Sequence, residues 1–332
     1  MLSLLEHADD YIATARALVE RRPSIVRLVG HGSSDAAAAF AVYAFGLLPG
    51  WTAVRDSISL LVYYEAQVDL ADSVVIALSQ SGQTPDVVAY VERARARGAR
   101  TIAVTNEPES ELARTAETLL PLAAGVERSV AASKTYLNTL AALALLAGAC
   151  AGRQKETVGA LRALADVLAG TLESLERAVS KVALAFAHVG RMYVIGRGME
   201  IATAREIALK LKETCRVAAE PLTATDLVHG PVATLDALFP VWVIASRDAG
   251  LRAVLEAAER ARAANATLVA SGSAAADVKE AAHVLPVSEA PLPVLAPLLS
   301  VVPGQLFAAT LARAKGLDPD HPEGLTKVTL AR

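Results

Sequence analysis

One pattern of strands and helices occurs twice in this chain of 332 residues, and that repeat constrains the fold more than any other feature. In the first half the apolar segments SIVRLVG, DSVVIALS and RTIAVTN alternate with helical segments that begin near Ser34 and Pro85. In the second half RMYVIGRG, FPVWVIAS and ATLVAS alternate with helical segments in the same way, and AHVLPV answers the earlier ETLLPL. The matching positions lie 166 or 167 residues apart: Gly30 with Gly196, Ser79 with Ser246, and Thr105 with Ser271.

Strands that alternate with helices predict a parallel sheet, and a fixed offset indicates a duplicated domain. We therefore predict an α/β protein with two tandem domains, each a doubly wound, flavodoxin-like parallel sheet with helices on both faces. The expected domains are residues 1–160 and 161–315, followed by a C-terminal tail, 316–332. The join is expected within the helical region 151–185, where AGRQKET has the polar character of a boundary.

Composition narrows the function classes. The net charge is −3 and no basic stripe is present, which argues against nucleic acid as a partner. The two cysteines, Cys150 and Cys215, cannot form a disulfide framework, and MLSLLEHADD lacks the pattern of a signal peptide. The longest apolar run, LAALALLAGAC, is too short to span a bilayer. We expect a cytoplasmic protein that binds neither membrane nor nucleic acid.

The segment ALSQSGQTPDVV combines an apolar strand, a turn rich in hydroxyl groups and a proline at a favoured first helical position. Unpaired backbone N–H groups at a helix start attract anions, and three hydroxyls can donate to a phosphate monoester without any lysine. The alternative is an ordinary N-cap and turn, which prefers the same residue types. The matching turn of the second half, ASRDAG, lacks the serine cluster, so one phosphate pocket per chain is expected.

The first turn after a strand, VGHGSSDAA, allows close backbone approach at its glycines, and Ser33 and Ser34 can face a ligand there. It fails as a dinucleotide fingerprint, because no third glycine follows Gly30 and Gly32 and no acidic residue ends the next strand. His31 is either catalytic or structural, and a lone histidine in a turn is more often structural.

On a helix expected from about Met199, Glu206, Lys210 and Glu213 are spaced to share one face. The usual interpretation of such a stripe is a solvated row of ion pairs. However, the polar segment AAEPLTATDLVHGP follows, and we expect it to be a loop that delivers His229. An acid, an ammonium group and an imidazole could then converge for proton transfer on a sugar.

Four motifs in this order, SQSGQT, ERSVAASKTYLNTL, GRG…ALKLKE and DLVHGP, resemble the sugar isomerase (SIS) family over nearly the whole chain. The resemblance is to the isomerase half of glucosamine-6-phosphate synthase and to stand-alone relatives of the deaminase type. The segment LKETC resembles the deaminase-type relatives more than the synthases. The sixteen residues from Glu213 to His229 match the family spacing. The closing GLTKVTLAR resembles the end of family members and matches Lys327 to an active-site lysine.

The resemblance implies roles for these residues. Glu213 would shuttle a proton between C1 and C2, Lys210 would lie beside the C1 oxyanion, and His229 would open the ring. In the family this histidine comes from the other subunit, which implies a homodimer with shared active sites. The residues implied in substrate binding are Ser79, Gln80, Ser81 and Thr84 for the phosphate, and Gly32, Ser33, Ser34, Val130 and Ala132 around the sugar.

Three departures from the family put the identity of the sugar in question more than the chemistry: His31 replaces a frequent Cys, Ala132 a Ser, and Val228 a Lys. No glutaminase domain is expected, because the first sheet strand follows within about 25 residues. We therefore expect an enzyme without metal or cofactor that converts glucosamine 6-phosphate, or a close relative, to fructose 6-phosphate and ammonia. The alternatives are an aldose–ketose isomerase or fructosamine-phosphate converter, and a non-catalytic sugar-phosphate-binding protein.

Overall fold

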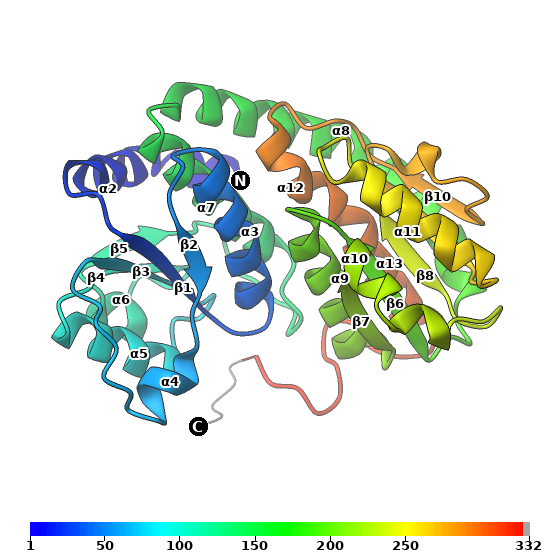
Figure 1. Ribbon diagram of the computed structural model, residues 1–332, viewed down its shortest axis with the longest axis horizontal. Coiled ribbons are helices and arrows are strands. Elements are labelled where there is room, and N and C mark those ends of the chain that lie inside the picture. Colours follow the sequence, from blue (N-terminus) through cyan, green and yellow to red (C-terminus); the bar gives the residue numbers. More distant parts are fainter. Residues whose placement is uncertain (328–332) are drawn as a thin grey trace. The chain divides into compact units, whose positions relative to one another are not determined.

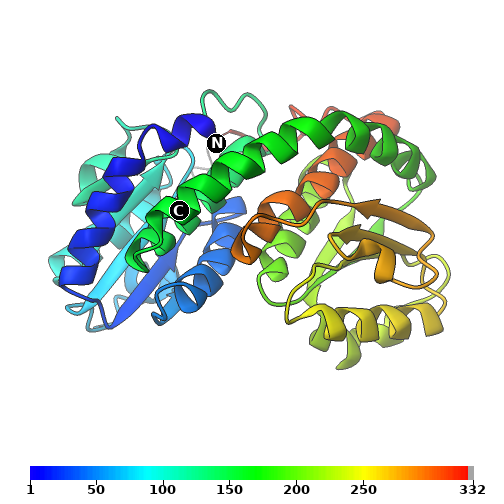
Figure 2. The ribbon, with the colours of Figure 1, turned by 90° about the horizontal axis from the view of Figure 1, so that it is seen from above.

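The computed structural model describes residues 1–327, and its contacts divide the chain into two compact units (Figure 1). Among the described residues, the first unit holds 1–127, 132–162 and 326–327, and the second holds 128–131 and 163–325. The division falls within one long helix, α8 (Gln154–Ala185), which Figure 2 shows as an uninterrupted coil. Each unit is described by itself.

The first unit contains a five-stranded sheet in the order β2-β1-β3-β4-β5, and all of its neighbouring strands are parallel. Its strands are β1 (Ile25–Val29), β2 (Ala53–Arg55), β3 (Ser73–Leu78), β4 (Arg100–Thr105) and β5 (Thr118–Pro121). The strands β3 and β4 are almost entirely buried, as expected for a parallel sheet that is covered on both faces.

Helices cover both faces of this sheet. On one face α7 packs against α2 and α3, and on the other α5 packs against α4 and α6. The helices of this unit are α1 (Leu2–Leu5), α2 (Ala8–Glu20), α3 (Ser33–Leu47), α4 (Ile58–Val62), α5 (Pro85–Ala96), α6 (Glu111–Thr115) and α7 (Lys134–Cys150). The apolar run in α7 is a buried core helix.

The second unit repeats the topology, in the order β7-β6-β8-β9-β10 with every neighbouring pair parallel. Its strands are β6 (Arg191–Gly196), β7 (Ala218–Thr223), β8 (Val241–Ile244), β9 (Leu268–Gly272) and β10 (His283–Pro286). The predicted fold of two doubly wound parallel sheets is therefore confirmed. The order, with the second strand outside the first, is that of flavodoxin-like folds.

The two faces of the second sheet are covered by different helices (Figure 1). On one face α9 (Glu200–Cys215) packs against α12 (Ala296–Ser300) and α13 (Val302–Ala314), and Trp242 of β8 meets Phe307 of α13 there. On the other face α10 (Ala224–Val228) packs against α11 (Leu251–Ala263) over a separate apolar cluster. Short 3₁₀ segments lie at Pro231–Thr234, Ala275–Asp277 and Pro293–Leu295.

Within residues 1–327, the stretch Pro293–Ala314 is the one helical segment long and apolar enough to cross a membrane. Its most apolar window is 72% buried within the protein. Core helices of soluble proteins pass the same test of length and composition, and this burial is what such a helix shows.

Candidate active site

The turn after β3 is shaped by hydrogen bonds among its own residues. The buried hydroxyl of Ser79 accepts a hydrogen bond from the Gly82 N–H at 3.0 Å and lies 3.4 Å from the hydroxyl of Thr84. Gly82 adopts φ +61°, and a Cβ there would lie 2.1 Å from the Ser110 hydroxyl. The close approach and the positive φ together require glycine at this position.

Thr84 is the N-cap residue of α5, but its side chain makes no capping hydrogen bond. The plain capping interpretation therefore does not account for this hydroxyl. Pro85 follows at the first helical position, where it has no N–H to leave unpaired, and the next N–H groups have no partner within the helix. The turn thus has the donors of an anion site, and the phosphate-binding role of Ser79, Gln80, Ser81 and Thr84 stays a prediction.

The turn after β1 lies beside it, because β1 and β3 are neighbours and Val29 pairs with Ala77. A Cβ on Gly30 would lie 2.8 Å from the carbonyl oxygen of Leu78, so the two turns are pressed together. Gly32, at φ +57°, precedes α3, whose first residues Ser33 and Ser34 are partly exposed. In this sheet order the β1/β3 boundary is the topological switch point, where ligands of such folds bind.

The structure pairs His31 of this turn with Asp86 in the first turn of α5, at 2.7 Å between Nε2 and Oδ2. The sequence alone indicated no partner for His31. Nothing in the linear pattern connects two residues 55 positions apart, so only the parallel pairing of the two strands could have suggested their contact.

In the second unit the predicted face of α9 is confirmed. The Lys210 ammonium lies between two carboxylates, 2.5 Å from Glu213 Oε2 and 3.6 Å from Glu206 Oε1. The spacing of four and three residues produces this contact, because such positions are neighbours on a helix.

Burial decides between a surface stripe and a functional cluster. The side chain of Glu206 is 0% exposed, that of Lys210 5% and that of Glu213 24%. A solvated row of ion pairs would be mostly exposed, so that interpretation is wrong for this helix. Burial alone lowers the pKa of Lys210, but the adjacent Glu206 and Glu213 carboxylates outweigh it, and the pKa is raised. Lys210 is therefore a fixed cation at neutral pH.

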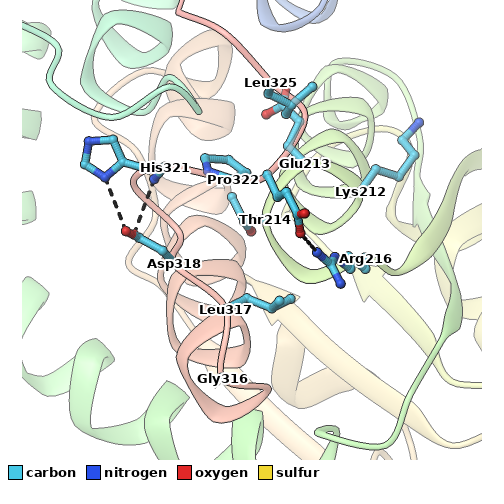
Figure 3. Close-up of a pocket in the computed structure, with 11 residues that line it drawn as sticks. Lys212, Glu213, Thr214, Arg216, Gly316, Leu317, Asp318, His321, Pro322 and Leu325 are labelled. Carbon is cyan, nitrogen blue, oxygen red and sulfur yellow. Dashed lines mark hydrogen bonds and ion pairs between the residues drawn. The ribbon is translucent and has the colours of Figure 1, made fainter.

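Glu213 opens onto a pocket of about 480 Å³ (Figure 3). One wall is the end of α9, with Lys212, Glu213, Thr214 and Arg216, and the other is the segment from Gly316 to Leu325. Pockets of this size hold small-molecule ligands. The cluster thus presents one partly exposed carboxylate to a cavity, with a buried ammonium group directly behind it.

The expected loop before His229 is wrong, because AAEPLT forms the edge strand β7 and ATDLV forms α10. Thr223 and Asp226 make a capping box that starts α10, and His229 is the exposed residue at its end.

The topology also separates His229 from Glu213 within one chain. The helix α9 leads from the carboxyl end of β6 back to the amino end of β7, so Glu213 lies near the amino edge of the sheet. His229 follows the carboxyl end of β7. Moreover, α9 and α10 cover opposite faces of the sheet. The convergence that the sequence suggested does not occur within this unit.

The remaining predicted site residues fall in both units. Val130 belongs to the second unit, where its N–H donates to the Asp320 carbonyl at 3.0 Å and so ties its segment to the tail. Ala132, just before α7, and Lys327 group with the first unit.

Sequence reasoning missed a buried acid at the start of α9. Glu200 accepts hydrogen bonds from the hydroxyls of Thr203, Ser246 and Ser300, at 2.5 to 2.8 Å. Burial raises the pKa of Glu200, although the three hydroxyl donors oppose the shift. The signal was present in the repeat, since Glu200 lies 166 residues after Ser34. In residues 1–327 no group of three or more His, Cys, Asp or Glu side chains is placed to hold a metal ion.

Comparison with known proteins identifies the family of this chain. The model of the SIS domain matches residues 3–149 and 185–314. The glutamine–fructose-6-phosphate aminotransferase (isomerizing) of Gloeobacter violaceus is 38% identical over 267 residues, 77% of this chain and 44% of the relative. That of Aeropyrum pernix is 37% identical over 309 residues, 90% of this chain and 50% of the relative. The chain thus spans about half the length of the curated relatives that it matches.

Two solved structures are similar over almost their full length. A protein of Silicibacter pomeroyi DSS-3, assigned as a phosphosugar isomerase, has a TM-score of 0.85 at 32% identity, with 96% of this chain and 95% of that chain covered. The C-terminal domain of glucosamine-fructose-6-phosphate aminotransferase from Francisella tularensis has a TM-score of 0.84 at 23% identity, with 96% and 97% covered.

Proposed function

Because the chain belongs to the SIS domain family, we propose that it is an amino-sugar-phosphate deaminase and isomerase. Its substrate would be glucosamine 6-phosphate or a close relative, and its products fructose 6-phosphate and ammonia. The observation that carries the proposal is Glu213, a carboxylate at the wall of a pocket with the buried Lys210 ammonium behind it. The relatives' names, which concern amination and isomerisation of fructose 6-phosphate, support the substrate class.

The reaction needs one base that works at two neighbouring carbons. In the open-chain sugar, Glu213 takes the proton from C2, and the resulting enolamine is reprotonated at C1 by the same carboxyl group. Water then hydrolyses the imine at C2, which releases ammonia and leaves the ketose. A partly exposed carboxylate beside a pocket can reach both carbons, whereas the fully buried Glu206 cannot.

Lys210 supplies charge and not a proton in this scheme. Its pKa is raised, so it stays an ammonium group throughout turnover. A fixed cation favours negative charge that develops on the C1 oxygen. Its two carboxylate contacts hold it in place, which limits the reorganisation that the reaction would otherwise require.

Recognition of the phosphate group is proposed for the turn after β3 in the first unit. Support comes from the Thr84 hydroxyl, which is not used for capping, and from the unpaired N–H groups at the start of α5. Gly82 allows the tight turn, and its N–H donates to the Ser79 hydroxyl.

We propose that His229 acts in the active site of a second copy of the chain, which makes the enzyme a homodimer. The support is the topology of the second unit, which holds His229 on the opposite face and at the opposite edge of the sheet from Glu213. A partner subunit can supply an imidazole that the same chain does not.

We also propose a cytoplasmic location. Both cysteines, Cys150 and Cys215, are free and buried, as in proteins of a reducing compartment.

The test measures both products and the exchange of the C2 proton with solvent. Purified protein is incubated with glucosamine 6-phosphate in D₂O, and ammonia, ketose phosphate and deuterium at C2 are measured. The wild type should release ammonia and ketose phosphate in equal amounts. Glu213→Gln should still bind the sugar but lose about 10² to 10⁴ in kcat and in the exchange rate, the usual scale for loss of a general base.

A matched control is Glu259→Gln, which removes an exposed helical carboxylate that also pairs with a lysine, Lys279 at 3.8 Å. It should leave turnover unchanged. Exchange that is as fast in the Glu213 variant as in the wild type would show that this residue is not the base. Exchange with ketose formed from an aldose phosphate, but without ammonia from the amino sugar, would assign the chain as a plain aldose–ketose isomerase.

A further inference from the structure

The phosphate-binding turn has no cationic side chain of its own. Residues 79–84 offer hydroxyls, two side-chain amides and backbone N–H groups, but no lysine or arginine. A phosphate monoester carries about 1.5 to 2 negative charges near neutral pH, so a nearby cation would strengthen its binding considerably.

His31 lies at the side of this turn. Its backbone is fixed, because its carbonyl accepts the Ser34 N–H at 3.0 Å as α3 begins. The preceding Gly30 is pressed against the carbonyl oxygen of Leu78, the residue before Ser79. The two turns follow neighbouring parallel strands at the switch point of the sheet, which places the His31 ring next to the start of α5.

The His31 ring is held through one of its two nitrogens, and more than half of the side chain is exposed to solvent. Nε2 lies 2.7 Å from Oδ2 of Asp86, whose side chain is only 13% exposed, whereas that of His31 is 56% exposed. The carboxylate thus accepts the Nε2 hydrogen, and Nδ1 is left to another partner. Neutral imidazole can only accept at Nδ1, whereas the protonated ring donates there.

Two further charged side chains near the two turns are engaged with each other. Asp35, in the first turn of α3, is bound by both Nε and Nη2 of Arg55 at 2.8 and 2.7 Å. The charged group that faces the His31 ring from α5 is Asp86. His31 is therefore a side chain that can add a positive charge beside the turn.

We propose that protonated His31, oriented by Asp86, binds the phosphate group of the substrate through Nδ1, so that phosphosugar binding takes up a proton at this ring. The inference rests on the proposed function for the class of ligand, a sugar phosphate. Because imidazole side chains change charge between about pH 5 and 8, the affinity for the phosphate group falls as the pH rises through this range.

The experiment measures binding by calorimetry between pH 5.5 and 8.5, in a Glu213→Gln background so that the sugar is not consumed. Glucosamine 6-phosphate is compared with unphosphorylated glucosamine, and sulfate serves as an anion that keeps its charge over this range. The phosphate itself titrates near pH 6, so the measured quantity is the ratio of Kd between the His31→Asn chain and its parent at each pH.

The ratio should be about 10 to 100 at pH 5.5, the value of one hydrogen bond between charged groups, and approach 1 at pH 8.5. His31→Lys, which carries a permanent cation, should bind sulfate with little dependence on pH. Asp86→Asn keeps the shape of the side chain but removes the charge that orients the ring. With Asp86→Asn in both chains, the ratio of Kd between the His31→Asn chain and its parent should be lower at pH 5.5. The matched control is His7→Asn, which removes the histidine of an exposed His7–Asp10 pair at 3.5 Å and should change nothing.

A ratio of 1 at every pH, or a ratio that does not vary with pH, would overturn the inference. The outcome is separable from that of the proposed reaction. Ammonia release by the wild type together with a flat ratio leaves the reaction standing and removes the role of His31. A pH-dependent ratio in a chain that releases no ammonia supports the role of His31 and contradicts the proposed reaction.

Discussion

Replacing Lys210 by Met tests whether the α9 cluster is as buried as the structure describes. Lys210 lies between Glu206, which is fully buried, and Glu213, which is partly exposed. The substitution keeps the length of the side chain but leaves two carboxylates without their cation. It acts on the second unit alone, because all three residues belong to it.

The expected cost is large for a single substitution. Two unit charges 3.6 Å apart attract by roughly 4 to 5 kcal/mol at an effective dielectric constant of about 20. Removing one partner of a buried ion pair costs about 3 to 5 kcal/mol, because the other charge stays buried. An exposed pair would cost only about 0 to 1 kcal/mol. For a unit of this size, 3 to 5 kcal/mol lowers Tm by about 6 to 20 °C.

The assay uses the two tryptophans, one in each unit. Trp51 belongs to the first, whereas Trp242 is fully buried in the second on the face that α9 covers. In a Trp51→Phe background, fluorescence reports unfolding of the second unit alone. The double variant Lys210→Met with Glu206→Gln removes the cation and the fully buried carboxylate. It should regain more than half of the stability that Lys210→Met loses. A loss below about 1 kcal/mol for Lys210→Met, or no recovery in the double variant, would refute the argument from burial.

Two further predictions concern the subunit arrangement and a second buried acid. If His229 acts across a dimer, mixing inactive Glu213→Gln and His229→Ala chains should restore up to one competent site per mixed dimer. If mixed dimers are shown to form and stay inactive, the histidine acts in its own subunit. Glu200 has a raised pKa in the fold, so between its unfolded and folded pKa values the native state binds more protons and stability falls as pH rises. Urea midpoints between pH 4 and 8 should show this decline in the wild type and a flatter profile in Glu200→Gln, and identical profiles would contradict it.

The central strands could be predicted from the sequence, whereas the edge strands could not. The strands β3, β4 and β8 are continuous apolar runs because both of their faces are buried. At the sheet edges β2 has only three residues, and β7 contains Glu220 and Pro221. An edge strand tolerates proline and charge because one of its sides has no strand partner, so AAEPLT resembles a loop in sequence.

The candidate site shows the same limit. Helical spacing predicted which side chains of α9 meet, because that depends on local geometry. It could not predict that Glu206 is fully buried, since the covering helices come from almost a hundred residues later in the chain. A Cβ on Gly304 of α13 would lie 2.3 Å from Ile207, which shows how closely α13 packs on α9. Burial turned an ordinary pattern of ion pairs into a candidate catalytic cluster, and burial is a property of the tertiary fold.

The duplication also gives a physical reason to expect the anion site in the first sheet and not in the second. Ser246 in the second unit corresponds to Ser79 in the first, and Glu200 corresponds to Ser34 by the same offset. In the second unit the Ser246 hydroxyl donates to the Glu200 carboxylate at 2.5 Å. The helix that follows β6 therefore brings its own carboxylate to the hydroxyl that matches Ser79. A hydroxyl donating its single hydrogen to an internal carboxylate cannot also donate it to a phosphate. An acid at the start of α9 and the loss of the serine cluster from the turn thus distinguish two sheets that share one topology.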